Sequence, residues 1–195
     1  LHIIKTLFNM KTGKNATPTI IVIFGGTGDL AKRKLIPAFY NLFLDSWMPE
    51  KFAIIGLGRT DLSDTDYSQR LHEGLIEFSR KGAPTEEKWA AFNTSISYFK
   101  SDINNAEDYK ELAIKLDSLD KEWGVRANRL FYLSVAPQFI EAVTTNINSS
   151  GLASVPTSDR IVIEKPFGYN KETAIELNNL LTRTFHEEQI YRIDH

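Results

Sequence analysis

The stretch that decides the fold is Ile20 to Tyr40, with the sequence IIVIFGGTGDLAKRKLIPAFY. Its first five residues are apolar and mostly β-branched, which predicts a buried central strand of a parallel sheet. A glycine-rich turn follows, and Asp29 begins a helix whose free N–H groups point back at that turn, a geometry that binds phosphate. The spacing Gly25-x-x-Gly28-x-x-Ala31 is a dinucleotide fingerprint in which alanine supplies the small third residue.

The turn and the start of the helix supply most of the candidate coenzyme contacts. These are Gly25, Gly26, Thr27, Gly28, Asp29 and Leu30. A basic triplet, Lys32 to Lys34, occupies the first helical turn, where the helix dipole disfavours cations. An anion bound nearby would offset that cost. Charge alone leaves open the alternative of a plain strand–helix connection with three solvated cations.

Composition limits the class of protein. With 195 residues, 42% of them hydrophobic, the chain can bury the core of one domain. The net charge of −2 argues against a nucleic-acid partner. There is no cysteine and the four histidines are scattered, so no metal site is expected. No apolar run approaches the ~18 residues of a membrane span, and no secretory signal is present, so we expect a cytoplasmic protein without a membrane partner.

Strands and helices alternate along the chain. The predicted strands are residues 20–24, 52–57, 95–100, 128–135, 160–164 and 190–193, and the predicted helices are 29–46, 64–81, 85–92, 106–123, 138–150 and 171–188. We expect Pro37 to kink the first helix. The alternation predicts an α/β fold over residues 19–195, a Rossmann-like, doubly wound and mostly parallel sheet with helices on both faces. Residues 1–18 are expected to be a native extension or a segment added for expression.

Further candidate residues follow the predicted strands. Arg59 follows the second strand, where arginine suits a 2′-phosphate, although a surface arginine on a loop is the alternative. Asp102 follows the third strand and is a candidate coenzyme contact. Lys165, in the sequence EKPFG, follows the fifth strand and could orient an anion or a carbonyl. The pair Asp194 and His195 follows the sixth and suggests acid–base chemistry. Lys165 and the pair Asp194 and His195 would open on the same crevice as the glycine turn.

Three stretches together resemble the glucose-6-phosphate dehydrogenase family, above all its bacterial members. GGTGDLAKRKLIP, EKPFG and the terminal RIDH match the motifs of that family in order and at plausible separation. The resemblance implies oxidation of β-D-glucose 6-phosphate at C1 to 6-phosphogluconolactone with NADP, the first step of the pentose phosphate pathway. NAD stays open as a coenzyme, because Thr60 stands where some relatives carry a longer polar side chain.

The resemblance also implies roles for individual residues. The turn from Gly25 to Leu30 lines the pyrophosphate and ribose of the coenzyme. Lys165 lies between coenzyme and sugar, and also serves as a catalytic and substrate-binding residue, while Lys34 reaches toward the substrate pocket. His195 grips the sugar phosphate, and Asp194 orients a general-base histidine that lies outside this chain.

The family pattern should continue beyond the terminal RIDH into a tyrosine, a leucine, a glycine and a lysine. We therefore expect the chain to be the coenzyme-binding domain of a longer dehydrogenase, cut before the substrate domain, with a full-length parent that is a homodimer or homotetramer. Two alternatives stay open. One is a sugar oxidoreductase of the glucose-fructose oxidoreductase type, against which the sequence GDLAKRKL stands. The other is a non-catalytic module that binds NADP.

Overall fold

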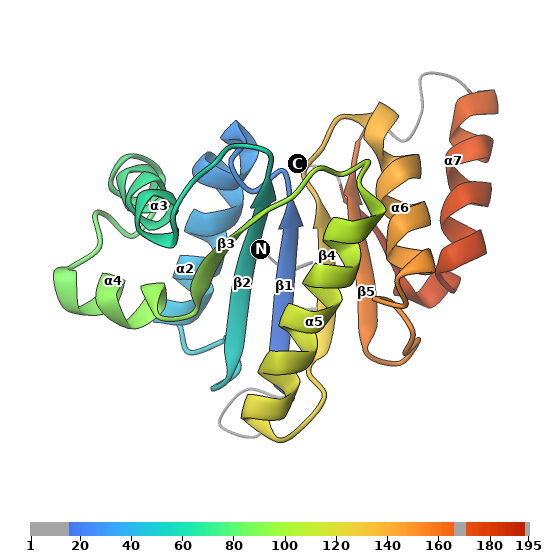
Figure 1. Ribbon diagram of the computed structural model, residues 1–195. Helices are drawn as coiled ribbons and strands as arrows, with labels where there is room; N and C mark the ends of the chain where they lie inside the picture. Colours follow the sequence, from blue (N-terminus) through green and yellow to red (C-terminus); the bar gives the residue numbers. More distant parts are fainter. Residues whose placement is uncertain (1–15, 166–170, 194–195) are drawn as a thin grey trace.

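A computed structural model describes residues 16–165 and 171–193, which form one parallel six-stranded sheet (Figure 1). The strands are β1 (Thr19–Phe24), β2 (Phe52–Gly58), β3 (Ile96–Lys100), β4 (Asn128–Leu133), β5 (Asp159–Glu164) and β6 (Ile190–Ile193). Their spatial order is β3-β2-β1-β4-β5-β6, so the direction of winding reverses between β1 and β4. This confirms the predicted α/β class. A ligand of such a sheet binds at the carboxyl ends of the strands, next to the reversal.

Helices cover both faces of the sheet. On one face lie α2 (Ile36–Leu44), α3 (Asp64–Phe78) and α4 (Glu86–Asn93), and on the other lie α5 (Ala106–Trp123), α6 (Ile140–Ser149) and α7 (Lys171–Thr184) (Figure 1). Three short turns complete the described elements: the π turn η1 (Ala31–Leu35) and the 3₁₀ turns η2 (Pro137–Phe139) and η3 (Glu187–Gln189). No helix in the described part of the chain is long and apolar enough to cross a membrane.

The central strand β1 is buried on both faces, which explains its unbroken apolar sequence. Ile21 and Ile23 contribute to the core that α2, α3 and α4 cover. Ile20, Val22 and Phe24 contribute to the core on the side of α5, α6 and α7. Because side chains alternate between faces along a strand, burial of both faces requires an apolar residue at every position.

The sequence predicts a kink at Pro37, and the structure has a π turn just before this residue. Residues 31–35 form this turn, and the N–H of Ile36 donates to the carbonyl of Ala31, five residues earlier. Proline has no N–H group to continue the regular ladder, so the chain leaves regular α-helical bonding at this point. The long helix predicted for residues 29–46 is therefore two segments.

Two predicted helices run too far at their carboxyl ends. The helix predicted for residues 64–81 ends at Phe78, because Ser79 adopts an extended conformation. The helix predicted for 171–188 ends at Thr184 and is followed by η3. The start of α3 agrees with the expected cap: Ser63 accepts the N–H of Asp66, whose carboxylate accepts the N–H of Ser63.

Candidate functional site

The glycine turn sits between the carboxyl ends of β1, β2 and β4. The N–H of Gly26 donates to the carbonyl of Leu57 at 2.8 Å, which ties the turn to β2. The N–H of Ser134 donates to the carbonyl of Phe24 at 2.9 Å, which ties β4 to the start of the turn. The turn is therefore fixed at the point where the winding of the sheet reverses.

The glycines of the turn serve different purposes. Gly25 has a positive φ of 79°, and a Cβ on it would lie 2.2 Å from the carbonyl oxygen of Ser134. A Cβ on Gly26 would lie 2.5 Å from the Cα of Gly56. Packing between strands thus requires both. A Cβ on Gly28 would meet only the carbonyl oxygen of Gly25, at 3.1 Å. Strand packing does not require Gly28, and a glycine at this position leaves backbone that a ligand could approach closely.

The helix after the turn presents free N–H groups. Its first hydrogen bond runs from the N–H of Lys32 to the carbonyl of Gly28 at 3.2 Å, so the N–H groups of residues 29–31 precede the helical ladder. Ala31 is fully buried, which agrees with its predicted role as the small residue under the turn. Backbone donors at the positive end of a helix dipole fit the pyrophosphate of a dinucleotide.

A cleft of about 240 Å³ opens above the turn, bordered by the ends of β2, β3 and β4. Five of the predicted coenzyme residues line it, namely Gly25, Thr27, Gly28, Arg59 and Asp102. Gly26 is buried beneath it. The structure therefore brings together predicted residues that follow three different strands, β1, β2 and β3.

Arg59 and Asp102 offer opposite charges to this cleft. The Arg59 side chain is exposed and has no hydrogen bond or ion pair to another described residue. Asp102 is held more firmly, because its Oδ1 accepts the N–H of Asn104 at 2.9 Å in the turn that leads to α5. The cleft thus presents a guanidinium that could bind a phosphate and a carboxylate that could accept a hydrogen bond from a hydroxyl.

Lys165 lines a second hollow next to the cleft. This hollow, of about 190 Å³, shares Ser134 and Val135 with the cleft and also contains Leu30 and Glu164. The backbone N–H of Lys165 donates to the carbonyl of Ile193 at 3.2 Å, which sets the end of β5 beside the end of β6. The predicted residues Asp194 and His195 follow directly in the sequence, outside the described residues.

A tyrosine that sequence reasoning missed supports this second hollow. The hydroxyl of Tyr132, on β4, donates to the Oε1 of Glu164. Burial, together with the hydrogen bond to Glu164, raises the pKa of Tyr132 above its usual value, so the hydroxyl remains a donor at neutral pH. Tyr132 lies within an apolar strand sequence, where nothing marks it as part of a site.

The basic triplet turns out to have partly structural roles. Arg33 pairs with Asp29 at 3.5 Å and also lies over the ring of Phe78, with its Cζ 4.9 Å from the ring centre. The stem of Lys32 fills the space left by Gly74, where a Cβ would lie 2.6 Å from the Lys32 Cγ. Lys34 is exposed and has no ion pair with another described residue. Of the triplet, Lys34 is thus the residue without a structural contact to another described residue, and it lines neither the cleft nor the second hollow.

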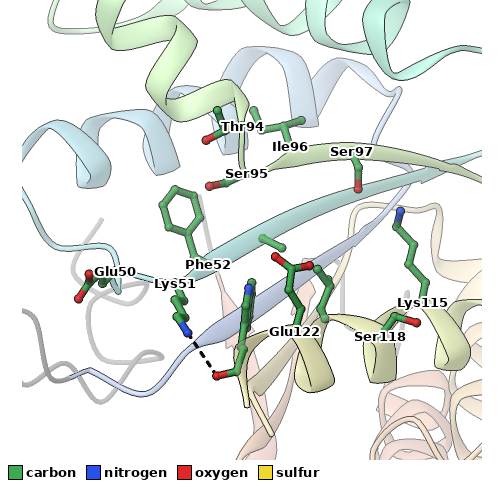
Figure 2. A pocket seen from close by; sticks show the side chains of 13 residues that line it. Glu50, Lys51, Phe52, Thr94, Ser95, Ile96, Ser97, Lys115, Ser118 and Glu122 are labelled. Atoms are coloured by element: carbon green, nitrogen blue, oxygen red, sulfur yellow. Dashed lines mark hydrogen bonds between the residues drawn. The ribbon is translucent and has the colours of Figure 1, made fainter. Parts of the chain in front are cut away.

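A larger hollow of about 500 Å³ lies at the opposite ends of the strands, between β2, β3 and α5 (Figure 2). Two acidic and two basic side chains line it, Glu50, Glu122, Lys51 and Lys115. Figure 2 shows that the Lys51 Nζ donates to the carbonyl of Trp123, at 3.2 Å. No predicted site residue lies there. Among the described residues, no group of three or more acidic or histidine side chains could hold a metal ion.

Comparison with known proteins identifies the family of the chain. The family described as "Glucose-6-phosphate dehydrogenase, NAD binding domain" matches residues 22–195. The chain belongs to the glucose-6-phosphate dehydrogenase family. It is 37% identical to glucose-6-phosphate 1-dehydrogenase of Leuconostoc mesenteroides over 91% of the chain, and 37% identical to that of Bacillus subtilis over 95%. These matches cover 36% and 37% of the two relatives, so the chain spans little more than a third of their length.

Solved structures of glucose-6-phosphate dehydrogenases share the fold. One, determined in complex with its substrate glucose-6-phosphate, superposes with a TM-score of 0.83 at 31% identity over 95% of this chain and 37% of its own. The enzyme from Mycobacterium avium has a TM-score of 0.77 at 27% identity over 90% of this chain and 36% of its own. The resemblance inferred from the three sequence motifs is thereby confirmed.

Proposed function

We propose that this chain is the coenzyme-binding domain of an NADP-dependent glucose-6-phosphate dehydrogenase, which oxidises β-D-glucose 6-phosphate at C1 to 6-phosphogluconolactone in the first step of the pentose phosphate pathway. The observation that carries the proposal is the cleft lined by both Gly28 and Arg59. Gly28 has no side chain to block a ligand from the backbone, and the guanidinium of Arg59 has no partner among the described residues. We propose that the substrate domain lies in further sequence, since the chain spans little more than a third of the length of these relatives.

The cleft residues fit NADP in the following way. The backbone around Gly28 and the N–H groups of residues 29–31 would bind the pyrophosphate. Arg59 would bind the 2′-phosphate by charge-assisted hydrogen bonds, and Asp102 would accept from a coenzyme hydroxyl. Because Thr60 adds only a short side chain after Arg59, NAD is retained as a second coenzyme in this proposal.

The second hollow fits the nicotinamide end of the coenzyme, where the reaction would take place. It adjoins the cleft through Ser134 and Val135, so the nicotinamide half of a bound coenzyme would extend toward Lys165. The bound coenzyme supplies the hydride acceptor. Lys165 would lie between coenzyme and sugar as a substrate-binding and catalytic residue, and Lys34 would reach toward the sugar phosphate.

The remaining roles rest on the end of the chain. His195 would bind the sugar phosphate, and Asp194 would orient the general-base histidine of the substrate domain. Removing a general base costs roughly 10²–10⁴-fold in rate, and missing sugar contacts add to that loss. The 195-residue chain alone should therefore bind coenzyme without catalysing its reduction.

The experiment is a titration of the 195-residue chain with NADP and with glucose 6-phosphate by calorimetry, followed by absorbance at the NADPH band with both present. We expect measurable NADP binding, weak or no sugar phosphate binding and no NADPH formation. A folded chain that binds no NADP would contradict the proposed coenzyme site. Turnover close to that of a full-length relative would show that the general base lies within these residues.

The proposal extends to the whole protein. We expect the full-length dehydrogenase to be a homodimer or homotetramer and to be located in the cytoplasm. Light scattering of the purified full-length protein tests the first expectation, and cell fractionation tests the second.

A further inference from the structure

Two buried tyrosines lie beneath the coenzyme cleft and come from different elements. Tyr67, on α3, is 1% exposed, and Tyr98, on the edge strand β3, is 7% exposed. Their ring centres are 5.1 Å apart. Each hydroxyl donates to the backbone carbonyl of a loop that borders the cleft. Burial raises the pKa of both tyrosines, so both hydroxyls remain donors at neutral pH.

Tyr67 supports the glycine turn. Its hydroxyl donates to the carbonyl of Gly26 at 3.1 Å. The hydroxyl reaches that position because Gly56 has no side chain, since a Cβ there would lie only 1.9 Å from the Tyr67 oxygen. The bond therefore acts on the part of the cleft that would contact the pyrophosphate, which NADP and NAD share.

Tyr98 supports the loop that carries Arg59. Its hydroxyl donates to the carbonyl of Thr60 at 2.7 Å, and its N–H donates to the Oδ1 of Asp64 at 2.6 Å. Both ends of the segment 60–64 are thus tied to one residue. The side chain of Arg59 has no partner among the described residues, so the backbone at Thr60 is what places its guanidinium.

We propose that Tyr98 is a positioning residue that sets the preference for NADP over NAD by holding the loop of Arg59, whereas Tyr67 supports the binding of both coenzymes equally. This inference rests on the proposed function, because it requires Arg59 to bind the 2′-phosphate. A charge-assisted hydrogen bond to phosphate depends on geometry. Without the hydrogen bond to the Thr60 carbonyl, the loop of Arg59 would have more conformations in the free protein. Binding of NADP would have to restrict them, which would lower its affinity.

The test measures dissociation constants for NADP and NAD with three variants that each lose one hydroxyl. Tyr98→Phe should weaken NADP binding about three- to tenfold, the range for one hydrogen bond, and leave NAD binding unchanged. Tyr67→Phe should weaken both by the same factor. Tyr40→Phe is the matched control, because Tyr40 is buried against Phe43 and Phe92, away from the residues that line the cleft, and should change neither.

A change in the ratio of the two constants is the decisive readout, because a loss of stability alone would not alter it. Should Tyr98→Phe fail to fold, Asp64→Ala releases the other end of the same segment and should give the same selective loss. Equal effects on both coenzymes, or none, would overturn the inference.

Arg59→Ala separates this inference from the proposed function. If Arg59→Ala weakens NADP selectively and Tyr98→Phe does not, the role of Tyr98 is wrong and the 2′-phosphate contact stands. If Arg59→Ala affects both coenzymes alike, the proposed 2′-phosphate contact itself is wrong, and the inference about Tyr98 fails with it.

Discussion

Arg59 at the carboxyl end of the sheet and two arginines at its amino end differ in burial and in pairing. At the carboxyl end of β2, Arg59 is exposed and has no ion pair with another described residue. At the amino ends, Arg126 makes two hydrogen bonds of 2.9 Å to the fully buried carboxylate of Asp159. Arg129 is 4% exposed and bonds to two carboxylates on α5.

The difference follows from burial. A buried charge must be paired, because an unpaired one loses its hydration without compensation. An exposed cation keeps its hydration, so it can remain unpaired at little cost in free energy. Arg59, Arg126 and Arg129 are all arginines near the end of a strand, so residue type does not separate them. Position does: the paired cations lie at or just before the start of a strand, and Arg59 directly follows one.

The largest effect is expected from Gly28→Val. The added methyl groups would occupy the space that a pyrophosphate needs, so NADP binding should fall below detection while the domain stays folded. Gly25→Ala is the contrasting variant, because its Cβ would meet the carbonyl oxygen of Ser134 at 2.2 Å and should destabilise the fold itself. Calorimetry and thermal unfolding of both variants give the answer. If Gly28→Val still bound NADP, the glycine turn would be only a connection between strand and helix and not a coenzyme site.

Next in size is Arg126→Met at the amino end. It leaves the buried carboxylate of Asp159 without its cation, so the free energy of unfolding should fall by about 3–5 kcal/mol. The control is Lys110→Met, which removes an exposed pair with Glu107 and should cost about 0–1 kcal/mol. Urea unfolding curves measure both. Similar losses in the two variants would show that burial is not what distinguishes the two ends.

Arg59→Ala should act on binding alone. We expect NADP affinity to fall by about 1.5–3 kcal/mol, the range for a hydrogen bond to a charged group, with NAD affinity and stability unchanged. Titration of both coenzymes against wild type and variant tests this. A drop in stability without loss of affinity would place Arg59 with the structural cations of the amino end.

The smallest effect concerns Arg192, on β6, which is paired although it lies near the carboxyl end. Its hydrogen bond to Glu187 lowers the pKa of that carboxyl below its usual value. The pair therefore contributes stability above the unfolded pKa of Glu187, and this contribution is lost as the pH falls through the folded value. In Arg192→Gln the pKa of Glu187 should rise toward its ordinary value. Side-chain NMR titration measures it, and an unchanged midpoint would remove Arg192 as the cause.

Much of the fold and part of the site could be predicted from local sequence signals. The apolar run of β1, the glycine turn and the strand-end positions of Arg59 and Lys165 all follow from short-range patterns. The ion pair of Asp29 with Arg33 also has a sequence signal, a spacing of four residues on a helix.

The supporting tyrosines could not be found in this way. Tyr67 bonds to a carbonyl 41 residues away and Tyr98 to one 38 residues away, and both occupy positions that an amphipathic pattern assigns to the core. One signal was available: glycines at 56 and 58 interrupt an otherwise apolar strand. Glycine inside a strand often marks the close approach of another group, which at Gly56 is the hydroxyl of Tyr67.

The π turn at residues 31–35 changes the phase of the helix that follows the cleft. Each residue of an α-helix advances the side-chain direction by about 100°, so one extra residue in a turn rotates every later side chain by that angle. With this shift, the buried Ala31 at the start of the turn and Ile36, five residues later, both contribute to the core on the side of α2. In a regular α-helix, side chains five positions apart differ in direction by about 140°. The extra residue therefore lets a small buried residue lie under the glycine turn while the apolar face of α2 still meets the sheet.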